Sequence, residues 1–299
     1  MSKLSKKRQK TVLITGCSDG GLGAALSVAY HKAGHRVFAT ARNPLKMVSL
    51  KALGIETLTL DVLSDESILA CVSSVTKLTR GTLDVLVNNA GAQYNMPISD
   101  LSITEAKKIF DLNVWSCIST IQAFLPLLRK AESGALIANH TSVGSVAGLP
   151  FQAAYNASKA ALAMFSDILR LELEGFNIKV VDLKTGGVKS NILANLTRTE
   201  LPKDSIYDAA REGAEKMLSG EKLKSLKGTF VDADAWAEGV VKDLSQSKPP
   251  HQIWRGGQAW LARIGTLLPV GLFDGQLKNI TGLDDVIRKI KGAQLSDSS

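Results

Sequence analysis

The chain is poor in cysteine, in aromatic residues and in long hydrophobic runs, and each shortage excludes a class of protein. Its three cysteines, Cys17, Cys71 and Cys117, have the spacing of neither a zinc site nor a disulfide framework, which predicts free thiols in a reducing compartment. The four histidines are scattered, so we expect no metal site. No run reaches the roughly 18 apolar residues of a membrane-spanning helix. The opening residues lack the apolar core of a secretory signal, and we therefore expect a cytoplasmic protein.

The charge balance is basic but does not indicate nucleic acid. The net charge is +8 over 299 residues, and five of the basic residues lie in the opening segment MSKLSKKRQK. Aromatic residues make up 5% of the chain, and no stripe of basic and aromatic side chains follows that opening. We predict no nucleic-acid partner. A basic surface suits anionic substrates or an anionic membrane face.

Short apolar or β-branched runs alternate with segments of helical periodicity over most of the chain. The predicted strands are residues 11–15, 36–40, 56–60, 83–88, 135–139, 177–183 and part of 251–257. Helical patterns lie at 21–34, 65–78 and 107–130. Strand and helix in alternation predict an α/β fold whose parallel sheet is covered by helices on both faces. Right-handed crossovers make such a sheet doubly wound.

No break in composition and no flexible linker divides the chain, so we predict a single domain over residues 1–299. Residues 1–9 form a basic tail. Residues 191–228 are polar and helix-prone, and they follow the last regular alternation, where a lid over the strand ends is expected. Residues 258–299 form a C-terminal extension that opens with the apolar stretch QAWLARIGTLLPVGLFDG. That stretch is either a packed helix or subunit contact, or part of a membrane surface or substrate channel.

The first predicted strand is followed by a turn with four glycines, Gly16, Gly20, Gly21 and Gly23, and then by an amphipathic helix. Glycine allows a tight turn and lets backbone N–H groups approach a pyrophosphate, whose charge the helix N-terminus stabilises. A glycine-rich turn alone is weak support for such a site. Its place directly after the first strand is typical of dinucleotide binding.

The end of the second predicted strand indicates which dinucleotide is bound. A carboxylate there hydrogen-bonds the 2′-hydroxyl of the adenosine ribose, whereas a 2′-phosphate is repelled by an acid and attracted by a cation. The sequence has Thr40 and Ala41 where the acid is expected, and Arg42 comes next. NADP(H) is therefore predicted over NAD(H). The alternative is that Arg42 is a solvated loop arginine.

These features and several later motifs together resemble the short-chain dehydrogenase/reductase family over about residues 10–190. The glycine turn is similar to the family's T-G-x-x-x-G-x-G, with one extra residue. The motifs LDVLSD, NNAG, DLNVW, HTSVGS and YNASK follow in the family's order. Tyr155 lies thirteen positions after Ser142, as in the family. The resemblance implies a Rossmann fold and an oxidoreductase that interconverts a ketone and a secondary alcohol with NADP(H).

The resemblance also implies roles for individual residues. The implied catalytic set is Asn113, Ser142, Tyr155 and Lys159. The implied cofactor contacts are Gly16, Ser18, Gly21, Leu22, Gly23, Thr40, Arg42, Asp61, Val62, Asn89, Tyr155, Lys159, Val188 and Ser190. The segment TGGVKS departs from the family's Pro-Gly turn, and Thr185 in place of the proline predicts a looser turn there.

The spacing of Tyr155 and Lys159 suits proton transfer, because side chains four residues apart share one face of a helix. A free phenol titrates at about 10, so we expect the Lys159 ammonium and the oxidised nicotinamide to lower the Tyr155 pKa. Ser142 is expected to donate a hydrogen bond to the substrate oxygen as charge develops on it. By analogy with the family, Asn113 interrupts its helix and holds a water that connects Lys159 to solvent.

Within the family, LITGCSDGGLG, VFATAR, TGGVKSNI and IWRGGQAWL together are similar to the fungal branch of NADPH-dependent 1-acyldihydroxyacetone-phosphate reductases. That resemblance implies a lipid-like ketone or a polyketide or terpenoid intermediate as substrate. It also implies peripheral contact with endoplasmic reticulum or lipid-droplet membranes, and a homo-oligomer, either a dimer or a tetramer.

Two other functions remain open from the sequence. One is a catalytically silent dinucleotide-binding protein with a regulatory or scaffold role, against which the complete catalytic set counts. The other is a serine–histidine hydrolase built on His140 and Ser142, for which the G-x-S-x-G elbow is absent.

Overall fold

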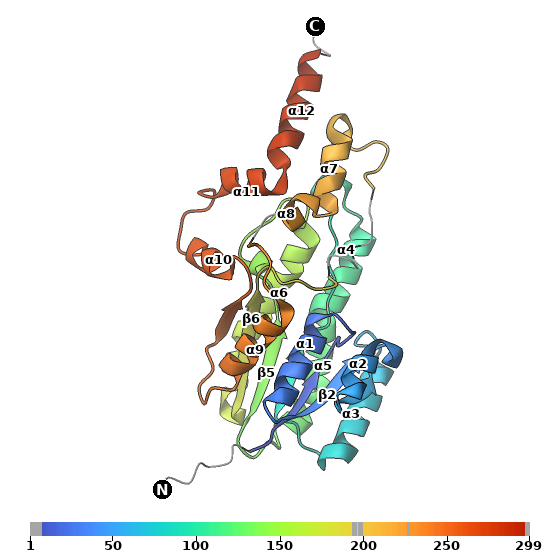
Figure 1. The fold of residues 1–299 in the computed structure, drawn as a ribbon, viewed down its shortest axis with the longest axis vertical. Coiled ribbons are helices and arrows are strands. Elements are labelled where there is room, and N and C mark those ends of the chain that lie inside the picture. Colours follow the sequence, from blue (N-terminus) through green and yellow to red (C-terminus); the bar gives the residue numbers. More distant parts are fainter. Residues whose placement is uncertain (1–7, 193–195, 197–199, 226–227, 297–299) are drawn as a thin grey trace.

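The computed structural model describes residues 8–192, 196, 200–225 and 228–296. Within these residues seven strands form one parallel sheet in the order β3-β2-β1-β4-β5-β6-β7 (Figure 1). The strands are β1 (Thr11–Ile14), β2 (Arg36–Ala41), β3 (Glu56–Thr59), β4 (Val85–Asn88), β5 (Ala135–His140), β6 (Ile178–Thr185) and β7 (Gln252–Arg255). The prediction of an α/β fold with a doubly wound parallel sheet is confirmed. Because strand order reverses between β1 and β4, their carboxyl ends border the crevice where such sheets bind ligands.

Helices cover both faces of the sheet. Contacts place α1 against α9 on one face, and α3 against α5 on the other, where α6 also packs on β6 (Figure 1). The helices are α1 (Leu22–Lys32), α2 (Val48–Ala52), α3 (Asp65–Thr79), α4 (Ile103–Phe110), α5 (Ser116–Leu128), α6 (Ala153–Glu172), α7 (Arg211–Leu218), α8 (Glu221–Ser225), α9 (Ala233–Leu244), α10 (Ala259–Gly265), α11 (Asp274–Thr281) and α12 (Leu283–Ser296).

The strand sequences explain the two-sided burial. In β1 the side chains of Val12 and Ile14 join the apolar cluster under α1 and α9, while Leu13 between them joins the cluster under α3 and α5. Successive side chains of a strand point to opposite faces, so a continuous apolar run is what a sheet covered on both sides requires. The sheet is thereby held rigid, and the loops at its carboxyl edge are carried on a fixed frame.

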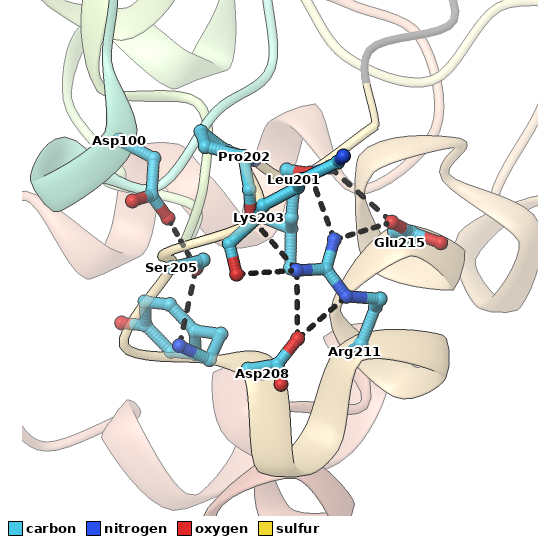
Figure 2. A network of polar contacts seen from close by, with 9 residues as sticks. Asp100, Leu201, Pro202, Lys203, Ser205, Asp208, Arg211 and Glu215 are labelled. Atoms are coloured by element: carbon cyan, nitrogen blue, oxygen red, sulfur yellow. Dashed lines mark hydrogen bonds and ion pairs between the residues drawn. The ribbon is translucent and has the colours of Figure 1, made fainter.

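Part of the predicted lid lies within the described residues, and Arg211 organises it. Figure 2 shows the guanidinium group among backbone carbonyls and carboxylates. It donates to the carbonyl oxygens of Leu201 and Pro202 at 2.8 and 2.7 Å. It also donates to the carboxylates of Asp208 and Glu215, at 2.8 and 3.3 Å. One side chain at the start of α7 therefore holds together the segment before it, residues 201–208.

A second contact joins this segment to the body of the protein. The Ser205 hydroxyl donates to Asp100 Oδ2 at 2.7 Å (Figure 2). The rings of Tyr207 and Phe151 pack edge to face with centres 5.1 Å apart. An apolar cluster lies beneath, formed by Tyr94, Met96, Ile109, Phe151, Ala154, Leu201, Ala210, Ala214, Met217, Leu218 and Val286. The rest of the predicted lid, residues 193–195, 197–199 and 226–227, lies outside the described residues.

The C-terminal extension divides into two parts. Val286 of α12 is buried in the same cluster as α7, so the later part packs on the predicted lid. The earlier part, α10 and the loop after it, has an unusually apolar exposed surface. We call it the α10 surface, and its exposed side chains are Trp260, Ile264, Leu267, Leu268, Val270 and Leu272. In the described part of the chain, no helix combines the length and apolarity needed to cross a membrane.

Candidate active site

The loop between β1 and α1 has the shape of a pyrophosphate cradle. Gly16 has a φ of +72°, and a Cβ at Gly23 would lie 2.5 Å from the Gly16 carbonyl oxygen. No side chain caps the N-terminus of α1, and its first turn has no acid, so its N–H groups are left for an anionic ligand. The Ser18 carbonyl accepts from the Gly21 N–H at 2.9 Å and closes the turn just before Leu22.

Asn89 of the NNAG motif, which follows β4, hydrogen-bonds to the glycine turn. Its backbone N–H and that of Ala90 both donate to the Thr15 hydroxyl, at 2.9 and 3.0 Å. Its side-chain amide donates to the carbonyl oxygens of Thr15 and Gly16, at 2.8 and 3.1 Å. Asn89 therefore lies beside the glycine turn, although its amide nitrogen is already used within the protein.

Thr40 and Arg42 at the end of β2 differ in what they can contact. The buried Thr40 hydroxyl donates to the Ile14 carbonyl at 2.9 Å, and the Thr40 carbonyl accepts from the Cys17 N–H at 2.8 Å. The polar groups of Thr40 thus hold the glycine turn against β2, and its role as a cofactor contact stays a prediction. Arg42 is exposed, and its guanidinium group is available to a ligand.

Asp61 and Val62 follow β3 at the same edge of the sheet, because parallel strands end on the same side. The Asp61 carboxylate accepts from the Leu63 N–H at 3.1 Å, and its own N–H donates to the Ser67 hydroxyl at 2.9 Å. These bonds shape the turn before α3. Val62 is buried against the adjoining apolar cluster.

The TGGVKS segment after β6 is held more firmly than the sequence predicts. Gly186 N–H donates to the Arg255 carbonyl at 2.8 Å, and Gly187 N–H donates to the Gly257 carbonyl at 2.9 Å. The Thr185 hydroxyl lies 2.7 Å from His140 Nε2. The expectation of a looser turn is wrong, because hydrogen bonds to β5 and to the end of β7 replace the rigidity that proline supplies.

The end of this segment fits a polar ligand group. Val188 is buried, and the buried Ser190 hydroxyl has no hydrogen-bond partner among the described residues. A buried polar group without a partner costs about 1–3 kcal/mol. An amide group of a bound ligand would satisfy it. Together with the uncapped N-terminus of α1, this unpaired hydroxyl makes the edge of the sheet fit a nicotinamide dinucleotide.

Three of the four predicted catalytic side chains meet where β5 and α6 approach each other. Ser142 follows β5, and its hydroxyl is hydrogen-bonded to the buried Tyr155 hydroxyl. Lys159 lies one turn further along α6, with Nζ 6.0 Å from the centre of the Tyr155 ring. Its ammonium donates to the His140 carbonyl at 2.8 Å. A Cβ at Gly91 would lie 3.4 Å from this nitrogen, so the NNAG turn adjoins it.

The predicted lowering of the Tyr155 pKa by Lys159 and the oxidised nicotinamide stays a prediction for the cofactor-bound protein. Burial raises the pKa of Tyr155 above its ordinary value, and the hydrogen bond with Ser142 offsets only part of this rise. Burial likewise lowers the pKa of Lys159. Removing water disfavours both charged forms. The chain alone therefore keeps Tyr155 a neutral phenol, which is the form that donates a proton.

Asn113 is buried where the helical segment 107–130 is interrupted. A π-helical turn, Asp111–Trp115, separates α4 from α5, so the predicted interruption is confirmed. The Asn113 amide exchanges two hydrogen bonds of 2.9 Å with the backbone of Ala92 and donates to the Ser158 hydroxyl at 3.0 Å. It thus ties the chain after NNAG to α6. The water expected beside Asn113 stays a prediction.

His140 does not belong to a hydrolase dyad. Its Nδ1 lies 2.9 Å from Asn89 Oδ1 and its Nε2 lies 2.7 Å from Thr185 Oγ1, so both ring nitrogens are engaged away from Ser142. The ring stacks on Trp236 with centres 5.4 Å apart. Burial, with a smaller contribution from Lys159, lowers the pKa of His140 to about 3.

A buried ion pair beneath the site was not predicted from the sequence. Lys184 Nζ lies 2.6 Å from Asp182 Oδ2, and both side chains are buried. The Thr141 hydroxyl donates to the same carboxylate, while Lys184 also donates to the Ser145 hydroxyl at 3.0 Å. These contacts fix the residues on either side of Ser142. The available signal was an acid and a base two positions apart in a predicted strand, which places them on one face.

A family model described as short chain dehydrogenase matches residues 10–201. The chain belongs to the short-chain dehydrogenase/reductase family. The solved structure of a short-chain dehydrogenase from Streptomyces avermitilis is similar in fold, with a TM-score of 0.74, 28% sequence identity, and coverage of 96% of this chain and 99% of that one.

Fungal short-chain dehydrogenases are among the relatives. A short-chain dehydrogenase/reductase of Pestalotiopsis microspora is 51% identical over 288 residues, which are 95% of this chain and 98% of that protein. The NADPH-dependent 1-acyldihydroxyacetone phosphate reductase of Schizosaccharomyces pombe is 37% identical over 289 residues, which are 92% of this chain and 95% of that protein. The chain thus matches oxidoreductases over nearly its whole length.

The lowered pKa of His140 predicts how stability depends on pH. The folded protein disfavours the protonated imidazole, so the unfolded chain takes up a proton first as the pH falls below the ordinary value of 6.5. This stabilisation is complete above that value and is lost toward about 3. The free energy of unfolding should therefore fall by about 2 kcal/mol from this source when the pH is lowered from 7 to 5.

Urea denaturation of the wild type and of His140→Gln at both pH values measures this contribution. On going from pH 7 to pH 5, the free energy of unfolding of the wild type should fall by about 2 kcal/mol more than that of His140→Gln. The control His251→Gln changes an exposed histidine and should behave as the wild type. Equal losses in the wild type and His140→Gln would contradict the prediction.

Proposed function

We propose that this short-chain dehydrogenase/reductase interconverts a ketone and a secondary alcohol with NADP(H), on a lipid-like or secondary-metabolite substrate. The observation that carries the proposal is the buried cluster of Ser142, Tyr155 and Lys159 beside the NNAG turn. A hydrogen-bond donor, a proton donor and a cation thus lie together next to a turn suited to a dinucleotide. That combination matches carbonyl reduction better than a silent binding role, which requires none of the three.

The chain's own residues supply the proton side of the reaction. NADPH, when bound, supplies the hydride that carbonyl reduction requires. Tyr155, kept neutral by burial, donates its phenolic proton to the substrate oxygen. Ser142 donates a hydrogen bond to the same oxygen as negative charge develops. Lys159 holds the ribose hydroxyls of the nicotinamide half, and its positive charge stabilises the phenolate left on Tyr155.

Asn113 supports this arrangement indirectly. It hydrogen-bonds to Ala92 after the NNAG turn and to Ser158 next to Lys159. It therefore fixes the position of the NNAG turn relative to α6. The proposed water beside it would return the proton from solvent to the site after each turnover. The regenerated phenol is the starting form for reduction, and the phenolate serves oxidation in the reverse direction.

The cofactor preference is carried by Arg42. No acid stands at the end of β2 to repel a 2′-phosphate, and Arg42 is exposed in the loop that follows. The S. pombe relative is named as NADPH-dependent, which supports the same choice for this chain. Gly16, Gly21 and Gly23 would approach the pyrophosphate, while Val188 and Ser190 would meet the carboxamide.

The substrate proposal rests on the lid and on the relatives. The segment that Arg211 holds together (Figure 2) packs on an apolar cluster. An apolar environment of this kind suits a substrate with hydrocarbon parts. The name of the S. pombe relative states an acyl-dihydroxyacetone phosphate as its substrate. An acyl-dihydroxyacetone phosphate, a polyketide or a terpenoid ketone would each present a ketone with an apolar portion.

Peripheral membrane contact is part of this proposal, with the endoplasmic reticulum or lipid droplets as the site. The α10 surface exposes several large apolar side chains, and α10 packs against the turn Val143–Ser145 that follows Ser142. Residues 258–273 contain one cation, Arg263, and no acid, which suits an anionic lipid surface. A lipid-like substrate would then enter beside the catalytic serine. The homo-oligomer, dimer or tetramer, stays a prediction.

Removal of the proton donor tests the reaction. Tyr155→Phe should lower turnover of a ketone substrate by about a hundredfold or more, since general acid catalysis contributes at least this much. NADPH binding, followed by fluorescence, should stay close to that of the wild type. Tyr30→Phe is the matched control, because that buried hydroxyl has no partner among the described residues and lies in α1. Unchanged turnover in Tyr155→Phe would refute the role.

Removal of the cation after β2 tests the cofactor. Arg42→Ala should weaken NADPH binding by about tenfold or more, because a charge-assisted hydrogen bond to phosphate contributes about 1.5–3 kcal/mol. NADH binding should change by less than about twofold. Lys51→Ala, which removes an exposed cation of α2, serves as the control. An equal loss for both cofactors would show that Arg42 contacts no 2′-phosphate.

Flotation with vesicles tests the membrane contact. Protein should float with vesicles of phosphatidylcholine and phosphatidylserine, and a triple change of Leu267, Val270 and Leu272 to Gln should abolish flotation. The matched control changes Leu45, Leu63 and Leu69 to Gln, which are also exposed leucines but lie elsewhere on the molecule. If both triple variants float like the wild type, the α10 surface does not bind lipid.

A further inference from the structure

His140 is a buried histidine that the proposed chemistry does not use. It ends β5, where its carbonyl oxygen accepts from Lys159 Nζ at 2.8 Å. Its side chain lies between two turns at the carboxyl edge of the sheet. One neighbour is Asn89 of the NNAG turn, and the other is Thr185, which opens the TGGVKS segment. Backbone and ring of one residue thus contact three parts of the site.

The hydrogen bonds around the ring determine its tautomer. The Asn89 amide nitrogen donates to the carbonyls of Thr15 and Gly16, so its oxygen faces His140 Nδ1. An amide oxygen only accepts, and Nδ1 must therefore carry the proton. A neutral imidazole then has a lone pair on Nε2, which accepts from the Thr185 hydroxyl at 2.7 Å. The hydrogen bonds thus form a chain in which Thr185 donates to His140, His140 donates to Asn89, and Asn89 donates to the glycine turn.

We propose that His140, as this neutral Nδ1–H tautomer, is a positioning residue that sets the distance between the NNAG turn and the TGGVKS turn. The proposal rests on the proposed function, because these two turns are the walls between which the nicotinamide half would lie. Thr185 completes the link where the family usually has proline. The stack of His140 on Trp236 of α9 holds the plane of the ring.

The geometry explains why a histidine suits this place. A ring spans the separation between β4 and β6 across β5 and offers one donor and one acceptor on opposite sides. An aliphatic side chain would leave Asn89 Oδ1 and the Thr185 hydroxyl unpaired in a buried region, which is costly. Burial, with a smaller contribution from Lys159, lowers the pKa of His140 and so keeps the ring in the neutral form that this pattern requires.

A binding experiment with two ligands separates positioning from general stability. NADPH spans the whole site, whereas 2′,5′-ADP occupies only the adenosine half. Thr185→Val removes the hydroxyl at nearly constant volume, and Thr185→Ser keeps it. If relaxation of the turns leaves about a tenth of the molecules competent, the Kd of NADPH rises about tenfold in Thr185→Val. The Kd of 2′,5′-ADP should change by less than about twofold, and Thr185→Ser should match the wild type for both ligands.

The outcomes distinguish this inference from the proposed function. Wild-type protein that binds neither ligand would overturn the proposed function. If the wild type binds NADPH and Thr185→Val binds it equally well, the positioning role is wrong. Equal weakening of both ligands would also overturn it, because that pattern indicates a loss of structure throughout the site.

A spectroscopic test needs no ligand. In ¹⁵N NMR spectra of the histidine-labelled protein between pH 6 and pH 8, His140 should show a protonated Nδ1 and an unprotonated Nε2 that does not titrate. In Thr185→Val the Nε2 signal should move while Nδ1 stays protonated. A proton on Nε2, or titration near the ordinary value of 6.5, would overturn the assignment.

Discussion

The buried ammonium group of Lys159 is the constraint on which the site depends. A buried cation is tolerated only when hydrogen-bond acceptors or counter-charges replace water. Here the acceptor is the carbonyl oxygen of His140 at the end of β5, at 2.8 Å. That bond places α6 on the sheet in one register. Because Tyr155 lies one turn before Lys159, the same bond also determines where the phenol meets Ser142.

The polar interior behind the site follows from that constraint. The carboxyl ends of β4, β5 and β6 carry Asn89, His140 and the Asp182–Lys184 pair, all of them hydrogen-bonded within the protein. Buried polar groups are expensive unless each has a partner, and once satisfied they specify a single arrangement. The Ser190 hydroxyl is an exception, because it has no partner among the described residues. This unpaired hydroxyl thus lies where a ligand is proposed to bind.

Local patterns in the sequence predicted the frame of the molecule and the catalytic helix. The strands and the placement of Tyr155 and Lys159 on one helical face depend on spacing of a few residues, which a single sequence carries. The link between His140 and Thr185 was missed because it depends on the register of β5 against β6, where His140 pairs with Leu183. The hydrogen bond between Thr40 and the Ile14 carbonyl was missed for a similar reason. Whether the Thr40 hydroxyl faces a ligand or the Ile14 carbonyl is decided by the neighbouring strand.

The predicted lid and the C-terminal extension are held by different kinds of contact from those that hold the sheet. Arg211 bonds backbone carbonyls of a loop, and such contacts leave no periodic trace in the sequence because any residue supplies a carbonyl (Figure 2). The lid packs on its own apolar cluster together with Val286 of α12, apart from the two clusters that hold the sheet. Ala154 of α6, which precedes Tyr155, belongs to the same cluster, so changes in the side chains of the predicted lid reach the helix that carries the proposed proton donor.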